Sequence, residues 1–103
     1  MGLVLFTFRF SGIEPGTPEM NGTKLLAKAA REPASCRFTE IQRLAEAHGF
    51  HLSRVTGSHH IYTHPGIPEL VNLQSVKGMA KAYQVRQILK LVERYNLKAE
   101  PDR

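Results

Sequence analysis

Residues 57–62, with the sequence GSHHIY, hold the side chains of this chain that are best suited to chemistry. Two neighbouring histidines, His59 and His60, begin a strand-like segment directly after a Gly-Ser pair that favours a tight turn. Histidine titrates near neutral pH, so it can take or give a proton under physiological conditions. A histidine in this position is therefore a candidate general acid or base.

The alternation of side chains along a strand predicts different surroundings for the two histidines. Successive side chains point to opposite faces, so His60 shares a face with Tyr62 and His64, and His59 shares the other face with Ile61. Because Ile61 is apolar, we expect its face to pack on the core and the face of His60 to be open. His60 is therefore the predicted catalytic residue.

Each histidine also has a plainer interpretation. His60 alone could be an ordinary exposed strand residue, and for His59 a packing or hydrogen-bonding role at the sheet edge is favoured over catalysis. We expect His64 in a turn, and His48 and His51 at ordinary surface positions. No metal site is expected, because adjacent strand histidines diverge.

The composition favours a small basic domain with an anionic partner. The 103 residues suit a single domain, and 14 Lys and Arg against 9 Asp and Glu give a formal net charge of +5. The partner could be RNA, DNA or an acidic protein surface. Cys36 is the one cysteine, which excludes an internal disulfide and favours a reducing, cytoplasmic setting.

The first 22 residues differ in character from the rest. Residues 2–10, GLVLFTFRF, are apolar but too short to cross a bilayer, and they lack the basic start and cleavage site of a signal peptide. Residues 11–22 contain two prolines and three glycines. We therefore expect an irregular or disordered N-terminal extension over residues 1–22, and a soluble protein without a membrane segment.

Two helices are expected before the strands. An Ala-, Leu- and Lys-rich stretch predicts a short peripheral helix over residues 23–31, ended near Pro33. Thr39 and Gln42 match a capping box, and Gly49 supplies a stop, so a second helix is predicted over residues 39–48.

A three-stranded antiparallel sheet and a last helix should follow. Strand patterns occupy residues 50–55, 59–64 and 70–74, with Val76 as an alternative end of the third, and a turn is expected at residues 65–68. Apolar residues spaced i, i+3, i+4 and i+7 predict a helix over residues 83–95, followed by a tail over residues 99–103. The fold class is α+β, with two helices on one face of the sheet and function on the other, free face.

The basic side chains gather toward the end of the chain. Residues 77–98 contain six basic side chains and one acidic one, and four of the basic side chains recur every four residues along the last helix. The plain interpretation is a solvated helix face, and the functional one is a contact with RNA or with an acidic partner protein. The four recurring residues are Arg86, Lys90, Arg94 and Lys98.

Three segments resemble the HicA family of toxins from bacterial and archaeal toxin-antitoxin pairs. They are HGF at residues 48–50, RVTGSHHIYTHP at 54–65 and VRQILK at 85–90, in the order helix, three strands, helix. The resemblance implies a domain over residues 23–98, with its core at 38–98, folded like a double-stranded RNA-binding domain. It also implies an mRNA interferase, a stress-response toxin neutralised by a HicB antitoxin.

The resemblance assigns the active residue to His60, because the active histidine of the family lies at the start of the second strand. RNA carries its own nucleophile, the 2′-hydroxyl, so the enzyme needs positioning, proton transfer and cations, but no metal or other cofactor. His60 would transfer the proton, and Tyr62 would stack on a base. The expected RNA-binding cations are Lys77, Lys81, Arg86 and Lys90.

Two other functions remain open. The chain could be a non-catalytic RNA-binding module that uses the same sheet and basic helix. It could also act mainly as an antitoxin-binding partner, with its basic surface against an acidic protein.

Overall fold

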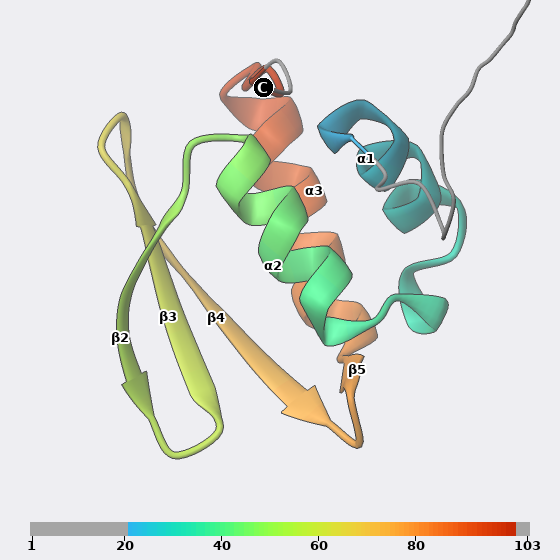
Figure 1. Ribbon diagram of the computed structural model, residues 1–103. Helices are drawn as coiled ribbons and strands as arrows, with labels where there is room; N and C mark the ends of the chain where they lie inside the picture. The colour runs from blue at the N-terminus through green and yellow to red at the C-terminus, as the bar shows by residue number, and fades with distance from the viewer. Residues whose placement is uncertain (1–20, 101–103) are drawn as a thin grey trace, which may run out of the picture.

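The computed structural model describes residues 21–100, which form three α-helices and an antiparallel sheet (Figure 1). The sheet has the order β2-β3-β4-β5. The helices are α1 (Gly22–Arg31), α2 (Phe38–Ala47) and α3 (Ala82–Arg94), with a short 3-10 helix at Pro33–Ser35 between α1 and α2. The strands are β2 (His51–Thr56), β3 (His59–His64), β4 (Ile67–Val76) and β5 (Met79–Ala80).

The α+β class and the helix, three-strand, helix order are confirmed, and β5 is an addition to the expected sheet. The expected turn at residues 65–68 is shorter, because Ile67 and Pro68 already belong to β4. Most of the expected extension over residues 1–22 and the end of the tail lie outside the described residues. Asn21 and Gly22 are the exceptions, since Asn21 caps α1 and Gly22 is its first residue.

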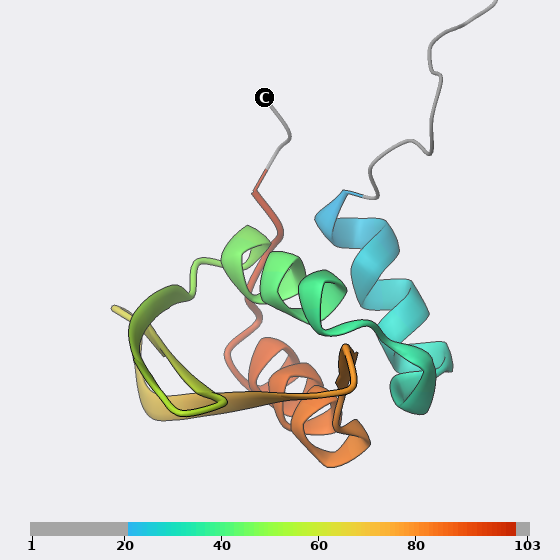
Figure 2. The same cartoon turned by 60° about the horizontal axis from the view of Figure 1, so that its bottom comes forward.

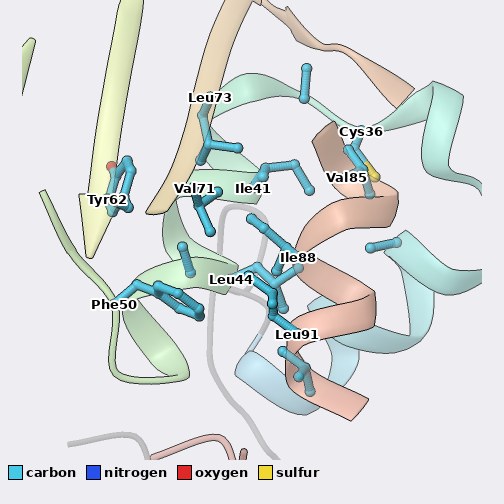
Figure 3. Close-up of a cluster of buried hydrophobic side chains, with 14 of the residues drawn as sticks. Cys36, Ile41, Leu44, Phe50, Tyr62, Val71, Leu73, Val85, Ile88 and Leu91 are labelled. Atoms are coloured by element: carbon cyan, nitrogen blue, oxygen red, sulfur yellow. The ribbon is translucent and has the colours of Figure 1, made fainter. Parts of the chain in front are cut away.

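The strand register decides which face of the sheet packs on the helices. Tyr62 lies beside Val71, and His60 beside Leu73, on one face of the β3–β4 pair. The side chains of Tyr62, Val71 and Leu73 are fully buried. Figure 3 shows Val71 and Leu73 directed toward Ile41 and toward α3. This face, and not that of Ile61, is therefore the core face, which reverses the prediction.

The core lies between this face and helices α2 and α3. These two helices contribute apolar residues at helical spacing, all of them at most 4% exposed. They are Ile41 and Leu44 from α2, and Val85, Ile88 and Leu91 from α3. Burying each of these side chains contributes roughly 1.5–3 kcal/mol, so the sheet and helices are held mainly by this cluster.

Helix α1 was expected to be peripheral, but it belongs to the packed structure. Leu25 and Ala29 are buried in the core, and α1 packs on both α2 and α3. Its Lys28 forms an ion pair with Glu40 of α2 at 2.9 Å. At its start, a Cβ on Gly22 would lie 2.8 Å from the Cβ of Ala47, so glycine permits the close approach.

The N-cap of helix α2 lies two residues before the predicted capping residue, Thr39. This N-cap is Arg37, and the backbone N–H of Arg37 donates to the carboxylate of Glu40 at 2.9 Å. Thr39 and Gln42 are therefore not the capping pair. At the other end, His48 is buried, in contrast to the expected surface position, and its Nδ1 donates to the carbonyl of Leu44 at 2.8 Å. This bond satisfies one of the last free carbonyls of the helix.

No helix within residues 21–100 combines the length and the apolar character that crossing a membrane requires.

Candidate active site at the start of strand β3

His60 lies at the beginning of β3, immediately after the turn formed by Gly57 and Ser58. Gly57 has φ +62°, a backbone conformation that glycine adopts without strain. The turn lies at the lower end of the molecule in Figure 1, together with the β4–β5 turn and the beginning of α2. Figure 2 brings this end forward. His60 is on the core face, but at its end, and its side chain is therefore partly exposed.

The imidazole of His60 is held by two contacts. Its ring packs edge-to-face against Phe38, with ring centroids 4.8 Å apart, and its Nδ1 lies 3.3 Å from the carbonyl oxygen of Ser58. A carbonyl oxygen can only accept, so Nδ1 carries the hydrogen in this arrangement. The lone pair of a neutral imidazole is then on Nε2, which has no hydrogen-bond partner among residues 21–100.

Phe38, whose ring contacts His60, is itself held in place by its backbone. Phe38 is the first residue of α2, and its backbone N–H donates to the carbonyl of Gly78 in the β4–β5 turn at 2.9 Å. An isolated bridge between Arg37 and Met79 adds to the same junction. The core face, α2 and the β4–β5 turn therefore converge on His60.

The other two histidines of β3, His59 and His64, have different surroundings from His60. His59 lies on the opposite face of the sheet, where its Nδ1 is 3.1 Å from the side-chain oxygen of Asn72. His64 lies at the far end of β3, where its Nδ1 accepts from the backbone N–H of Gly66 and its ring packs on Phe50. His59 therefore has the expected hydrogen-bonding role, although β3 is an inner strand and not the sheet edge. His64 was expected in a turn, but it is the last residue of β3 and contacts the following turn through its side chain.

Tyr62 does not have the predicted exposure. Its side chain is 0% exposed, and its hydroxyl accepts a hydrogen bond from Gln42 Nε2 at 3.1 Å. Burial raises the pKa of this phenol above its usual value, although the hydrogen bond from Gln42 partly opposes the shift. Figure 3 shows the ring beside the core cluster. A buried ring cannot stack on a base, so Tyr62 is a core residue.

A chain of hydrogen bonds ties the beginning of α3 to the turn that precedes His60. Gln84 Oε1 accepts from the backbone N–H of Gln74 at 2.8 Å, and Gln74 Nε2 lies 3.1 Å from Ser58 Oγ. Gln84 Nε2 is 3.4 Å from the hydroxyl of Tyr83. None of these residues was predicted as part of the site. The available signal was Gln84 itself, which falls four residues before Ile88 on the apolar stripe of α3, where a polar side chain needs partners.

The predicted cations are spread over this end of the molecule and along α3. Lys77 is exposed in the β4–β5 turn, next to the glycine whose carbonyl binds α2. Lys81 is the N-cap of α3, with its Nζ 6.0 Å from the ring centroid of Tyr83. Arg86 is exposed in the next turn of α3, whereas Lys90 lies one further turn away from the His60 end.

Metal ligation and thiol chemistry are the other candidates among the same residues. Within residues 21–100, no three His, Cys, Asp or Glu side chains are grouped as metal ligands would be, and the surface encloses no pocket. Cys36 is buried, and burial raises the pKa of its thiol.

Comparison with known proteins assigns the chain to a family. Residues 38–93, which are 56 of the 103 residues, match the family model of the HicA toxin of bacterial toxin-antitoxin systems. The match begins at the first residue of α2, includes His60 and ends in the last turn of α3, so α1 lies outside it. Searches of curated proteins and of solved structures gave no match. Because the family model covers more than half of a chain with this fold, the chain belongs to the HicA toxin family.

Proposed function

We propose that this toxin is an endoribonuclease that cleaves mRNA without a metal ion, with His60 as the residue that transfers the proton. The observation that supports this role is the bond between His60 Nδ1 and the Ser58 carbonyl. It directs the lone pair of a neutral ring to Nε2, at the partly exposed end of the core face. A general base requires such a nitrogen, held in one orientation and accessible to a hydroxyl.

The reaction needs one bond to form and one to break at phosphorus. The 2′-oxygen of a ribose attacks the adjacent phosphate, and the bond from phosphorus to the 5′-oxygen breaks. His60 Nε2 accepts the proton of the 2′-hydroxyl, and water supplies the proton that the leaving 5′-oxygen takes. One positioned acid or base contributes roughly 10²- to 10⁴-fold, so we expect a slow enzyme.

The negative charge on the phosphate needs cations close to His60. Lys77 and Lys81 stand on either side of β5, whose preceding turn is hydrogen-bonded to the beginning of α2. Arg86 follows in the next turn of α3. Cations placed where charge develops stabilise the transition state more than the ground state. Lys77 and Lys81 are therefore proposed to bind the reacting phosphate, and Arg86 and Lys90 the RNA backbone beyond it.

Replacing His60 tests this proposal, and His59 offers a matched control. His60→Ala should lower the rate of RNA cleavage in EDTA by roughly 10²-fold or more, because the proton acceptor is lost. His59→Ala should cleave at a rate within about threefold of the unchanged protein, since His59 is on the other face. The measurement is cleavage of a defined RNA resolved by gel electrophoresis, with RNA binding and circular dichroism recorded for each variant.

The alternative function, a non-catalytic RNA-binding module, predicts different results. If the unchanged protein binds RNA but does not cut it, or if His60→Ala cuts as fast as the unchanged protein, the catalytic role of His60 is wrong.

Family membership also suggests the partner. We propose that an antitoxin of the HicB type neutralises this chain by covering the end of the domain that contains His60, Lys77 and Lys81, called the basic end below. An acidic surface on the antitoxin would suit a chain with a formal net charge of +5.

A further inference from the structure

Tyr83 has an unusual position for an aromatic residue in a small domain. Of the phenylalanine and tyrosine rings in residues 21–100, it alone is exposed, with 59% of its surface accessible. It lies in the first turn of α3, at the end of the molecule that contains His60 (Figure 1). The core is complete without this ring, so packing does not explain it.

The exposed ring is nevertheless held in place. Its hydroxyl lies 3.4 Å from Gln84 Nε2, and Gln84 is only 1% exposed and is anchored to the backbone of Gln74 at 2.8 Å. Lys81 Nζ is 6.0 Å from the ring centroid, within reach of a weak cation–π contact. A ring that is already ordered loses less conformational entropy when a ligand packs on it.

The same hydrogen bonds connect this ring to the candidate catalytic histidine. From Gln84 they lead to Gln74, from Gln74 Nε2 to Ser58 Oγ at 3.1 Å, and from the Ser58 carbonyl to His60 Nδ1 at 3.3 Å. Tyr83 and His60 are therefore connected through three intermediate residues. This linkage favours a role for Tyr83 in presenting substrate to His60.

The charges around Tyr83 favour an anionic ligand. Helix α3 has no acidic residue in its first turn, and Glu93, in its last turn, is the one acidic residue between residues 77 and 98. Lys81 is the N-cap of this helix and lies over the Tyr83 ring, and the exposed Arg86 follows three residues after Tyr83. Nucleic acid combines anionic phosphates with flat bases that stack on aromatic rings.

We propose that Tyr83 and Lys81 form a subsite for one unpaired nucleotide of the RNA that His60 cleaves, an inference that rests on the ribonuclease activity proposed above. The base stacks on the exposed face of Tyr83, and Lys81 contacts a neighbouring phosphate. Every base offers a π-face, so the subsite selects single-stranded over paired RNA and has little preference among bases. The substrate class is therefore an unpaired segment of RNA.

Binding is tested in the His60→Ala background, so that no cleavage is needed. Adding Tyr83→Ala should raise the Kd for a fluorescent single-stranded oligoribonucleotide roughly 5- to 150-fold, the range expected for one stacked base. Tyr83→Phe keeps the ring and should restore affinity to within about threefold. Gln87→Ala, an exposed change on the same helix, is the control for surface substitution.

Two further readouts separate stacking from a structural effect. The emission of 2-aminopurine, placed at successive positions in the RNA, should fall on binding at one position with Tyr83 and at none with Tyr83→Ala. With His60 intact, Tyr83→Ala should raise KM for single-stranded RNA with kcat within about threefold, and thermal unfolding should be unchanged.

The outcomes distinguish this proposal from the one on which it rests. If the unchanged protein cuts RNA and Tyr83→Ala binds and cuts like it, the subsite is wrong and the nuclease stands. If no protein cuts RNA but binding still depends on the ring of residue 83, the subsite stands as an RNA-binding site without catalysis. If Tyr83→Ala weakens binding of an antitoxin and leaves RNA binding intact, the ring is a protein contact and the subsite is wrong.

Discussion

Tyr62 of the sheet is buried and Tyr83 of α3 is exposed, and removing the hydroxyl of Tyr62 tests what the buried side chain does. Tyr62→Phe removes a buried hydroxyl that accepts a hydrogen bond from Gln42. We expect the free energy of unfolding to fall by about 1 kcal/mol, the usual net contribution of such a bond, and the Kd for RNA to be unchanged. Urea denaturation and fluorescence anisotropy measure the two quantities.

A second substitution isolates the hydrogen bond from other effects of the change. In a Gln42→Ala background, Tyr62→Phe should cost less than it does alone, because the donor is already absent. A loss of RNA affinity in Tyr62→Phe, with the free energy of unfolding unchanged, would instead assign the Tyr62 hydroxyl to an RNA contact and contradict its role in the core.

At the residue scale, the sequence led to His60 by one argument that is wrong and one that is untested. The apolar character of Ile61 was used to choose the core face, but its neighbours across the sheet decide the matter. Tyr62 pairs with Val71 and is buried, while Ile61 pairs with Asn72 on the other face. A strand segment alone does not contain its partner's register, which is why the prediction failed.

At the scale of elements, the helices and the three main strands were predictable because each has a clear apolar period and a clear stop. The two-residue strand β5 was not, since two residues have no period. It exists because the β4–β5 turn is fixed by the bond from Phe38 N–H to Gly78. The packing of α1 on α2 was not predicted, because it depends on contacts between separate elements. One of them is the Lys28–Glu40 pair, which joins residues 12 apart in sequence.

That ion pair makes the stability of the α1–α2 junction depend on pH. Burial alone would raise the pKa of Glu40, but the hydrogen bonds from Lys28 and from the Arg37 N–H hold it below its ordinary value. A lowered folded-state pKa means that the stabilisation is present above the unfolded-state value, roughly 4.3, and is lost as pH falls through the folded value.

Replacing Glu40 tests this dependence. Glu40→Gln should lower the free energy of unfolding at pH 7 by about 1 kcal/mol, and the difference from the unchanged protein should shrink in acid, below the folded-state pKa. Urea denaturation across this pH range measures it. Glu46→Gln, an exposed change on the same helix, should show a much smaller difference at pH 7. An equal difference at every pH would assign the effect to packing instead.

At the scale of the whole molecule, the two ends of the domain differ in the contacts of their charged side chains. At the far end, Glu69 accepts hydrogen bonds from the Tyr95 hydroxyl at 2.8 Å and from Arg94 at 3.0 Å, which fastens the end of α3 to β4. The hydrogen bond from Tyr95 lowers the pKa of Glu69, which keeps its carboxylate charged. The His60 end instead presents Lys77 and Lys81 without a carboxylate in the first turn of α3.

This asymmetry predicts how toxicity and neutralisation depend on the same end of the domain. Induced expression in a bacterial host should arrest growth, and His60→Ala should abolish the arrest while His59→Ala preserves it. Co-expression of the protein encoded by the adjacent reading frame should restore growth, because an acidic antitoxin over the basic end excludes RNA from His60.

Charge reversal with Lys77→Glu and Lys81→Glu should weaken the toxin–antitoxin complex, measured by calorimetry, and make the weakened affinity less sensitive to salt. If the unchanged chain does not arrest growth, the toxin function assigned to this basic end is wrong, and if charge reversal leaves antitoxin affinity unchanged, the antitoxin binds elsewhere.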